Sequence, residues 1–302
     1  MALKNVFFNQ FHLLRNYFLE GNGTMKILKS NKNFSICSLS LKEENRKIPN
    51  TQKIYVLSDV HFGHPQTDLS LLIRHLEQAK QEGALIIDNG DFFETRQFQN
   101  QSSFTKTNKY DFYENMVDKA FNLLKPYAKN IIAMGWGDQE MKVHSRSKMD
   151  LTYSLLKKLS NEGSRGFSFK NEWWVYLIFN GQHHEEVLRI RMTHDGGGNG
   201  AMVSRGTVAI NRMAAHLPDV DLVINGHNHQ AYIVPLARQQ PNPNGSMQRK
   251  LVYFVRVPGY QRNSLQSEPE SRNGLPHPLG CAVITIGLNP HPYVKSVSLL
   301  VE

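Results

Sequence analysis

Short apolar runs that each end in aspartate or histidine constrain this chain more than any other feature. The run Ile54–Leu57 leads into Asp59 and His61, and the run Leu222–Ile224 leads into His227 and His229. Apolar runs of this length between turn residues are typical of strands buried on both faces of a sheet. In α/β proteins the loops after such strands meet in one crevice. The sequence therefore predicts an α/β protein with a shared polar site.

Three further strand-like runs end in the same kinds of side chain. Asp91 follows Gly90 after the run 85–87, Asp138 follows the run 130–134, and His194 follows the run 188–193. Imidazole and carboxylate together suit Mn²⁺, Fe²⁺ or Zn²⁺. The candidate metal ligands are Asp59, His61, Asp91, Asp138, His194, His227 and His229. Seven ligands exceed the need of one ion and suit two ions that share a carboxylate, about 3.5–4 Å apart in two-metal hydrolases.

The order of elements points to two sheets. Helical spacing of apolar residues predicts helices near 68–82, 111–125, 150–160 and 203–215. Strands are expected near 54–58, 84–88, 130–134, 173–179, 187–192, 222–225, 231–234, 251–257, 281–286 and 293–300. Strands and helices alternate in the first half, which implies a largely parallel sheet, whereas the second half is rich in strands. We expect two sheets packed face to face, within a domain at 51–302 that follows an N-terminal extension or leading strands at 1–50.

Composition limits the class of protein. The 302 residues include 35 Lys and Arg against 26 Asp and Glu, a formal charge of +9. This excess favours a polyanionic partner such as nucleic acid, although a solvated lysine-rich surface is an equal alternative. The basic residues near the site motifs are Arg96, Lys142, Arg146, Lys148 and Arg205. Two distant cysteines exclude a disulfide scaffold, and no apolar run reaches the roughly 18 residues of a membrane span. We therefore expect a cytoplasmic protein that does not bind membranes.

The strand-end motifs, taken in order, resemble those of the calcineurin-like metallophosphoesterases. The matching motifs are Asp59-x-His61, Gly90-Asp91-x-x-Glu94, Gly137-Asp138-Gln139-Glu140, His194 and Gly226-His227-x-His229, within residues 53 to 260. The resemblance implies a four-layer α/β/β/α sandwich of two mixed sheets with helices on the outer faces. It also implies two divalent metal ions, with Mn²⁺ expected first and Fe²⁺, Zn²⁺ or Mg²⁺ as alternatives.

The resemblance assigns a role to each ligand. Asp59, His61 and His229 would hold the first metal ion. Asp91 would bridge the two ions. Asp138, His194 and His227 would hold the second ion. The reaction implied is hydrolysis of a phosphoester, and the basic charge directs our expectation to phosphodiesters of nucleic acid or nucleotides.

One position departs from the family pattern and bears on catalysis. Gln139 occupies the place of a histidine that the family is thought to use as proton donor to the leaving group. An amide cannot release a proton near neutral pH, although it still donates hydrogen bonds. Three interpretations follow: substrates with good leaving groups, a proton supplied by His64 or His144, or a catalytically weak domain that binds metal or nucleic acid. The candidate catalytic residues are therefore Gln139, His64 and His144, and the oligomeric state is open.

Overall fold

The computed structural model describes residues 24–30, 35–41, 51–96, 106–170, 172–179, 187–194, 203–217, 219–241, 245–262, 277–288 and 293–302. Its helices are α2 (Leu69–Gln81), α4 (Lys106–Leu124), the 3₁₀ turn η2 (Lys125–Tyr127), α5 (Asp138–Ser147), α6 (Leu151–Ser160) and α7 (Val203–His216). Its strands are β1 (Thr24–Ser30), β2 (Ser35–Leu41), β3 (Thr51–Leu57), β4 (Leu85–Asp88), β5 (Ile131–Met134), β6 (Phe167–Ser168), β7 (Glu172–Phe179), β8 (Val187–Thr193), β9 (Leu222–Asn225), β10 (Tyr232–Pro241), β11 (Met247–Arg256), β12 (Gly280–Gly287) and β13 (Tyr293–Val301).

The strands form two mixed sheets. One sheet has the order β13-β12-β3-β4-β5-β6, in which β3 to β6 run parallel and β12 and β13 are antiparallel additions. The other has the order β1-β2-β7-β8-β9-β11-β10, and its neighbours β8, β9 and β11 run parallel. Each sheet thus places several adjacent parallel strand ends at one edge, where loops can combine into a site.

Strand β3 shows why the two sheets lie face to face. Tyr55 and Leu57 pack with residues of α2, α4 and α6, whereas Ile54 and Val56 pack with residues of the opposite sheet. This division follows from the two-residue period of a strand, whose successive side chains point to opposite faces. A strand covered on both faces is apolar at every position, and this accounts for the unbroken run in the sequence.

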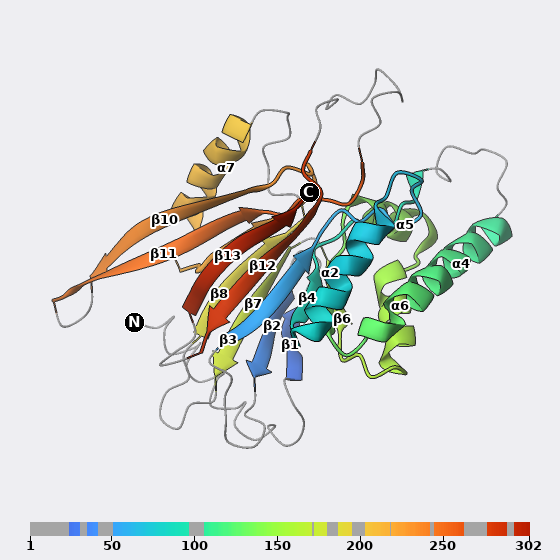
Figure 1. Cartoon of the computed structure of the whole chain (residues 1–302), viewed down its shortest axis with the longest axis horizontal. Coiled ribbons are helices and arrows are strands. Elements are labelled where there is room, and N and C mark those ends of the chain that lie inside the picture. Colours follow the sequence, from blue (N-terminus) through green and yellow to red (C-terminus); the bar gives the residue numbers. More distant parts are fainter. Residues whose placement is uncertain are drawn as a thin grey trace.

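Helices cover both outer faces. Figure 1 shows α2, α4 and α6 on one side of the molecule and α7 on the other. A separate apolar cluster joins Ile210 of α7 to Val223 of β9 and Phe254 of β11. The layers therefore run helix, sheet, sheet, helix, and the expected α/β sandwich with two mixed sheets is confirmed.

Some expected boundaries differ from the structure. Helix α5 was not expected, because Val143 is its one buried apolar residue, so its sequence has a weak helical pattern. Helix α4 begins at Lys106, five residues before the expected start. Strands β1 and β2 lie within the segment 1–50 and join the second sheet through β7, while a domain boundary at residue 50 stays a prediction. In the described part, no helix is long and apolar enough to cross a membrane.

Candidate metal centre

Two groups of acidic and imidazole side chains meet where strand ends of both sheets converge. Asp59, His61 and His229 form one group, and Asp91, His194 and His227 form the other; within each, the candidate ligand atoms all lie within 4.8 Å of one another. These residues follow β3, β4, β8 and β9. His194 connects the groups, because its Nε2 lies 3.2 Å from Asp91 Oδ2 and 3.7 Å from Asp59 Oδ1. Six of the seven predicted ligands are thus brought together.

The backbone at these ligands adopts a conformation that side chains rarely take. Among the described residues, six positions other than glycine have a positive φ, and five of them are predicted ligands. They are Asp59 (51°), His61 (50°), Asp91 (53°), His227 (77°) and His229 (57°). A residue other than glycine in this region costs free energy, and such positions cluster at functional sites. The strand-end turns therefore carry strain at the residues that face the site.

Hydrogen bonds fix each carboxylate and leave one oxygen facing the site. Asp59 Oδ2 accepts from Ser58 Oγ (2.6 Å) and from the backbone N–H of His227 (2.8 Å), whereas its buried Oδ1 has no hydrogen-bond partner in the described structure. Asp91 Oδ1 accepts from the backbone N–H of Gln139 (2.8 Å), and its Oδ2 faces His194. In each carboxylate, hydrogen bonds to one oxygen fix the side chain, and the other oxygen is available to a metal ion.

The histidines are oriented in the same way. Nδ1 of His61 lies 3.2 Å from Glu94 Oε2, and Nδ1 of His194 lies 3.0 Å from the carbonyl oxygen of Asn89. Each contact leaves Nε2 buried without a hydrogen-bond partner in the described structure, and the same is true of His227 Nδ1. Buried polar atoms without partners are rare, and metal-binding histidines commonly donate their second ring nitrogen to a carboxylate or carbonyl. The donor set fits divalent metal ions.

The charges of the buried groups depend on one another. Burial raises the pKa of Asp91, but the adjacent His194 outweighs this and holds the pKa below its usual range. Burial disfavours the imidazolium of His194, yet Asp91 and Asp59 raise the pKa of His194 well above its ordinary value. Burial lowers the pKa of His229 to about 4 and so keeps its ring neutral. The two carboxylates beside His194, those of Asp91 and Asp59, thus favour a positive charge at this place, such as a metal ion.

Asp138 occupies a peripheral place. It begins α5, its side chain is about one-third exposed, and its Oδ2 lies 3.9 Å from His227 Nδ1. It lies outside both compact groups. Its role as a ligand of the second ion stays a prediction.

Gln139 is buried beside the ligands. Its Oε1 accepts a hydrogen bond from Thr95 Oγ1 at 2.7 Å, and its backbone N–H is the one that bonds Asp91. The side-chain oxygen is thus engaged, and Nε2 remains as the donor end of the amide. A hydrogen-bond donor rather than an acid therefore stands next to Asp91.

The two alternative proton donors have different surroundings. The backbone N–H of His64 bonds the carbonyl of His61, and its half-buried ring accepts from the backbone N–H of Gln66 at 3.1 Å. Burial lowers the pKa of His64, which keeps it neutral near pH 7. His144 instead packs its ring 4.7 Å from that of Trp136. The structure brings His64 next to a ligand, while the described contacts of His144 lead to the Trp136 side of α5.

Two glutamates support the site, although no role was predicted for them from the sequence. Glu94 contacts His61 and also accepts from the backbone N–H of Arg96 (2.7 Å). Glu140 accepts from the backbone N–H groups of Gly137 (2.8 Å), Phe93 (3.0 Å) and Asp91 (3.1 Å). Glu140 therefore ties the turn after β4 to the start of α5. Both glutamates follow a Gly-Asp pair in the sequence, and this position was the available signal that they lie beside the metal ligands.

Two glycines allow the close approach of these loops. A Cβ atom at Gly137 would lie 2.2 Å from Asp91 Oδ1, and one at Gly226 would lie 2.0 Å from Ser58 Oγ. Such distances exclude any side chain unless the neighbouring atoms move. The glycines in the motifs thus serve packing against the ligands.

The predicted basic rim is only partly placed by the structure. The guanidinium of Arg96 lies 3.3 Å from Glu94 Oε2 and 3.4 Å from His61 Nδ1, and its side chain is about half exposed. Lys142, Arg146 and Lys148 are exposed along α5 and at its end, and the side chain of Arg205 lies outside the described residues. Among the predicted rim residues whose side chains are described, Arg96 is the one that contacts a candidate ligand.

Comparison with solved structures returned proteins of low sequence identity. A predicted phosphoesterase from Streptococcus pneumoniae is 12% identical over 84% of this chain and 100% of its own, with a TM-score of 0.31. Vps29 complexed with zinc, from Entamoeba histolytica, is 11% identical over 83% and 98%, with a TM-score of 0.33. A metallophosphoesterase from Sphaerobacter thermophilus is 12% identical over 83% and 88%, with a TM-score of 0.29. No protein-family model and no curated protein matches the chain, so we infer function from the site itself.

Proposed function

We propose that the protein is a metal-dependent phosphoesterase with a dinuclear centre. The supporting observation is the set of buried ligand atoms that lack a hydrogen-bond partner: Asp59 Oδ1, His61 Nε2, His194 Nε2 and His227 Nδ1. Leaving a buried polar atom unpaired costs free energy, and a bound cation removes that cost. All four atoms belong to the two groups that converge between the sheets.

The two ions would be held by different ligands. Asp59, His61 and His229 would hold the first ion, and His194, His227 and Asp138 the second. Asp91 would be shared, since its free oxygen lies 3.2 Å from His194 Nε2 while its other oxygen is held by Gln139. Divalent ions at such a centre polarise phosphate oxygens and lower the pKa of a bound water. Mn²⁺ is our first candidate, because the mixed imidazole and carboxylate donors suit borderline metals.

The residues around the centre would define what the enzyme can do to a phosphoester. The guanidinium of Arg96 would attract the phosphate, and the amide of Gln139 would donate a hydrogen bond to a phosphate oxygen. Gln139 cannot protonate a leaving group, and the lowered pKa of His64 makes it a poor proton donor near pH 7, so esters with good leaving groups are favoured. The formal charge of +9 supports nucleic acid or nucleotide phosphodiesters as substrates.

The test combines metal content with turnover. The protein, purified and incubated with Mn²⁺, should hold about two ions per chain and hydrolyse bis-p-nitrophenyl phosphate. Asp91→Ala should lose bound metal and the hydrolysis of bis-p-nitrophenyl phosphate. Asp219→Asn, an exposed control, should match the parent in both measurements. Two bound metal ions without turnover under Mn²⁺, Zn²⁺ or Mg²⁺ would contradict the proposal.

A second candidate function is a metal-retaining domain that binds nucleic acid and cleaves it poorly. It is favoured by one observation, the burial of Gln139 with its oxygen bonded to Thr95 at the place of the acid. Under this alternative, Gln139→His should gain hydrolysis of an ester with a poor leaving group. Affinity for DNA or RNA that falls steeply with salt would support nucleic acid as the partner in either case.

A further inference from the structure

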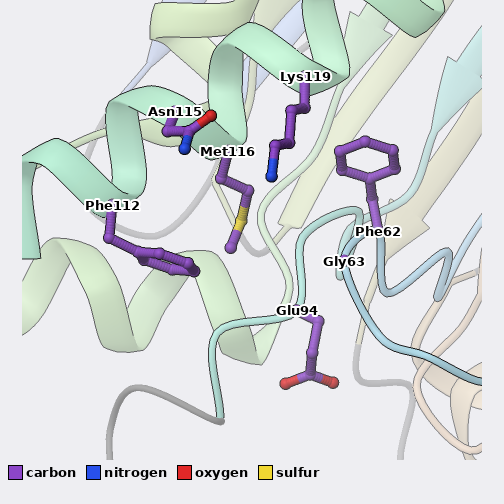
Figure 2. A pocket seen from close by; sticks show the side chains of 7 residues that line it. All are labelled: Phe62, Gly63, Glu94, Phe112, Asn115, Met116 and Lys119. Carbon is purple, nitrogen blue, oxygen red and sulfur yellow. The ribbon is translucent and has the colours of Figure 1, made fainter.

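A cavity of about 120 Å³ lies between α4 and the loops that carry the metal ligands. Its wall is formed by Phe62, Gly63, Glu94, Phe112, Asn115, Met116 and Lys119. Figure 2 shows Met116 and Lys119 extending from α4 towards the loop of Phe62 and Gly63. The cavity is smaller than the roughly 300–1,000 Å³ of typical ligand pockets, so it suits one small group of a larger ligand.

The cavity shares two residues with the surroundings of the metal centre. Phe62 directly follows the ligand His61, and its backbone N–H bonds the carbonyl of Phe92, next to the ligand Asp91. Glu94 lines the cavity and also lies 3.2 Å from His61 Nδ1. A ligand with its phosphate at the metal ions could therefore place an attached group here.

The apolar part of the lining suits a flat group. Phe62, Phe112 and Met116 offer two aromatic rings and a thioether, which favour contact with an aromatic ring. The wall therefore favours a flat group that presents an aromatic face.

The remaining two side chains supply hydrogen bonds. Lys119 and Asn115 are exposed on α4, and within the described part of the chain no carboxylate pairs with Lys119. An ammonium and an amide can donate to the oxygen or nitrogen acceptors of a ring, which a plain phenyl group does not have. The lining thus combines stacking surface with donors at its open side.

We propose that this cavity binds the nucleobase of a nucleotide phosphoester. The proposal rests on the proposed function for the position of the phosphate, and it deepens that function by assigning a binding site to the base of a nucleotide substrate. Stacking of a base and its hydrogen bonds to Lys119 and Asn115 would select nucleotide esters over esters that lack a ring.

The experiment compares three diesters with one leaving group: thymidine 5′-(p-nitrophenyl phosphate), phenyl p-nitrophenyl phosphate and methyl p-nitrophenyl phosphate. With Mn²⁺, the parent should prefer the thymidine ester to the methyl ester by roughly 5- to 150-fold in kcat/KM, the range expected for one stacked base. Phe112→Ala should reduce this ratio several-fold. Lys119→Met should reduce the ratio of thymidine to phenyl ester, whereas the exposed control Lys125→Met should leave both ratios at the parent value.

Equal kcat/KM values for the three esters in the parent would overturn the proposal. If Lys119→Met reduces kcat/KM equally for the thymidine and phenyl esters, the cavity recognises any aryl group and not a nucleobase. That result would also overturn the proposal. If no ester is turned over, the proposed function fails, and calorimetry still tests the cavity. Thymidine 5′-monophosphate should then bind at least several-fold more tightly than inorganic phosphate, with the difference lost in Phe112→Ala; equal affinities in the parent would overturn the cavity assignment.

Discussion

Glu94 Oε2 lies 3.2 Å from Nδ1 of His61, and both side chains are buried. His61 belongs to the group with Asp59 and His229, and its Nε2 is buried without a hydrogen-bond partner in the described structure. A carboxylate behind a metal-binding histidine sets the tautomer of the ring and raises its basicity. Glu94 is therefore expected to be a positioning residue for metal binding.

Substitution Glu94→Gln should weaken metal binding by about 10- to 100-fold, the usual effect of removing such a partner. The measurement is a competition titration of the loaded protein with a chelator, read as metal content. Glu162→Gln, in an exposed turn after α6, is the control and should retain the parent affinity. Unchanged affinity in Glu94→Gln would show that the contact does not orient a ligand.

Substitution Gly226→Ala should remove metal binding and destabilise the fold. The new Cβ would lie 2.0 Å from Ser58 Oγ and 2.8 Å from Asp59 Oδ2, so Asp59 must move. Overpacking of this kind typically costs about 1–3 kcal/mol in the free energy of unfolding. Thermal unfolding and metal content measure both effects. At Gly245 a Cβ would meet no described atom within 4 Å, and its φ of +82° limits the cost of alanine to local backbone strain, so Gly245→Ala should keep its metal ions.

Removal of metal ions should lower the thermal stability of the parent. Asp59 and Asp91 are both buried and both lie beside His194 Nε2. A ligand that binds only the folded state stabilises it by about 2.7 kcal/mol at 100 times its Kd. Tm should therefore fall on chelation and recover when Mn²⁺ is added. Asp91→Ala should show little response to either treatment. A parent Tm that does not depend on metal would contradict metal binding at this centre.

His75 should make stability depend on pH. Its Nδ1 lies 2.9 Å from Tyr260 Oη. Burial lowers the pKa of His75, the nearby charge of Arg74 lowers it further, and Glu302 offsets part of this by raising it. The unfolded chain therefore binds more protons, and stability is lost as the pH falls through the ordinary histidine range near 6.5. The free energy of unfolding of the parent should decrease relative to that of His75→Phe between pH 7.5 and 5.5. A difference that stays constant over this range would exclude the effect.

Most strands, and the polar residues at their ends, could be predicted because both depend on local sequence. The run Ile54–Leu57 is apolar at every position since it is covered on both faces, and the buried strand β9 leaves the same mark at Leu222–Ile224. Glycine directly before a candidate ligand marked the turns at Gly90 and Gly226. Helix α5 was missed because its buried face is made of Gln139, Glu140 and Val143, which lacks an apolar stripe.

The chain order of the motifs was enough to propose which residues meet, since parallel strands bring their ends to one edge of a sheet. Which atoms face inward is a different matter, because it depends on partners far along the chain. Asn89 orients His194 across 105 positions, and Asp59 accepts from the backbone of His227 across 168. Those hydrogen bonds join the two sheets and exist only once both are packed, and no local pattern encodes contacts at such separations.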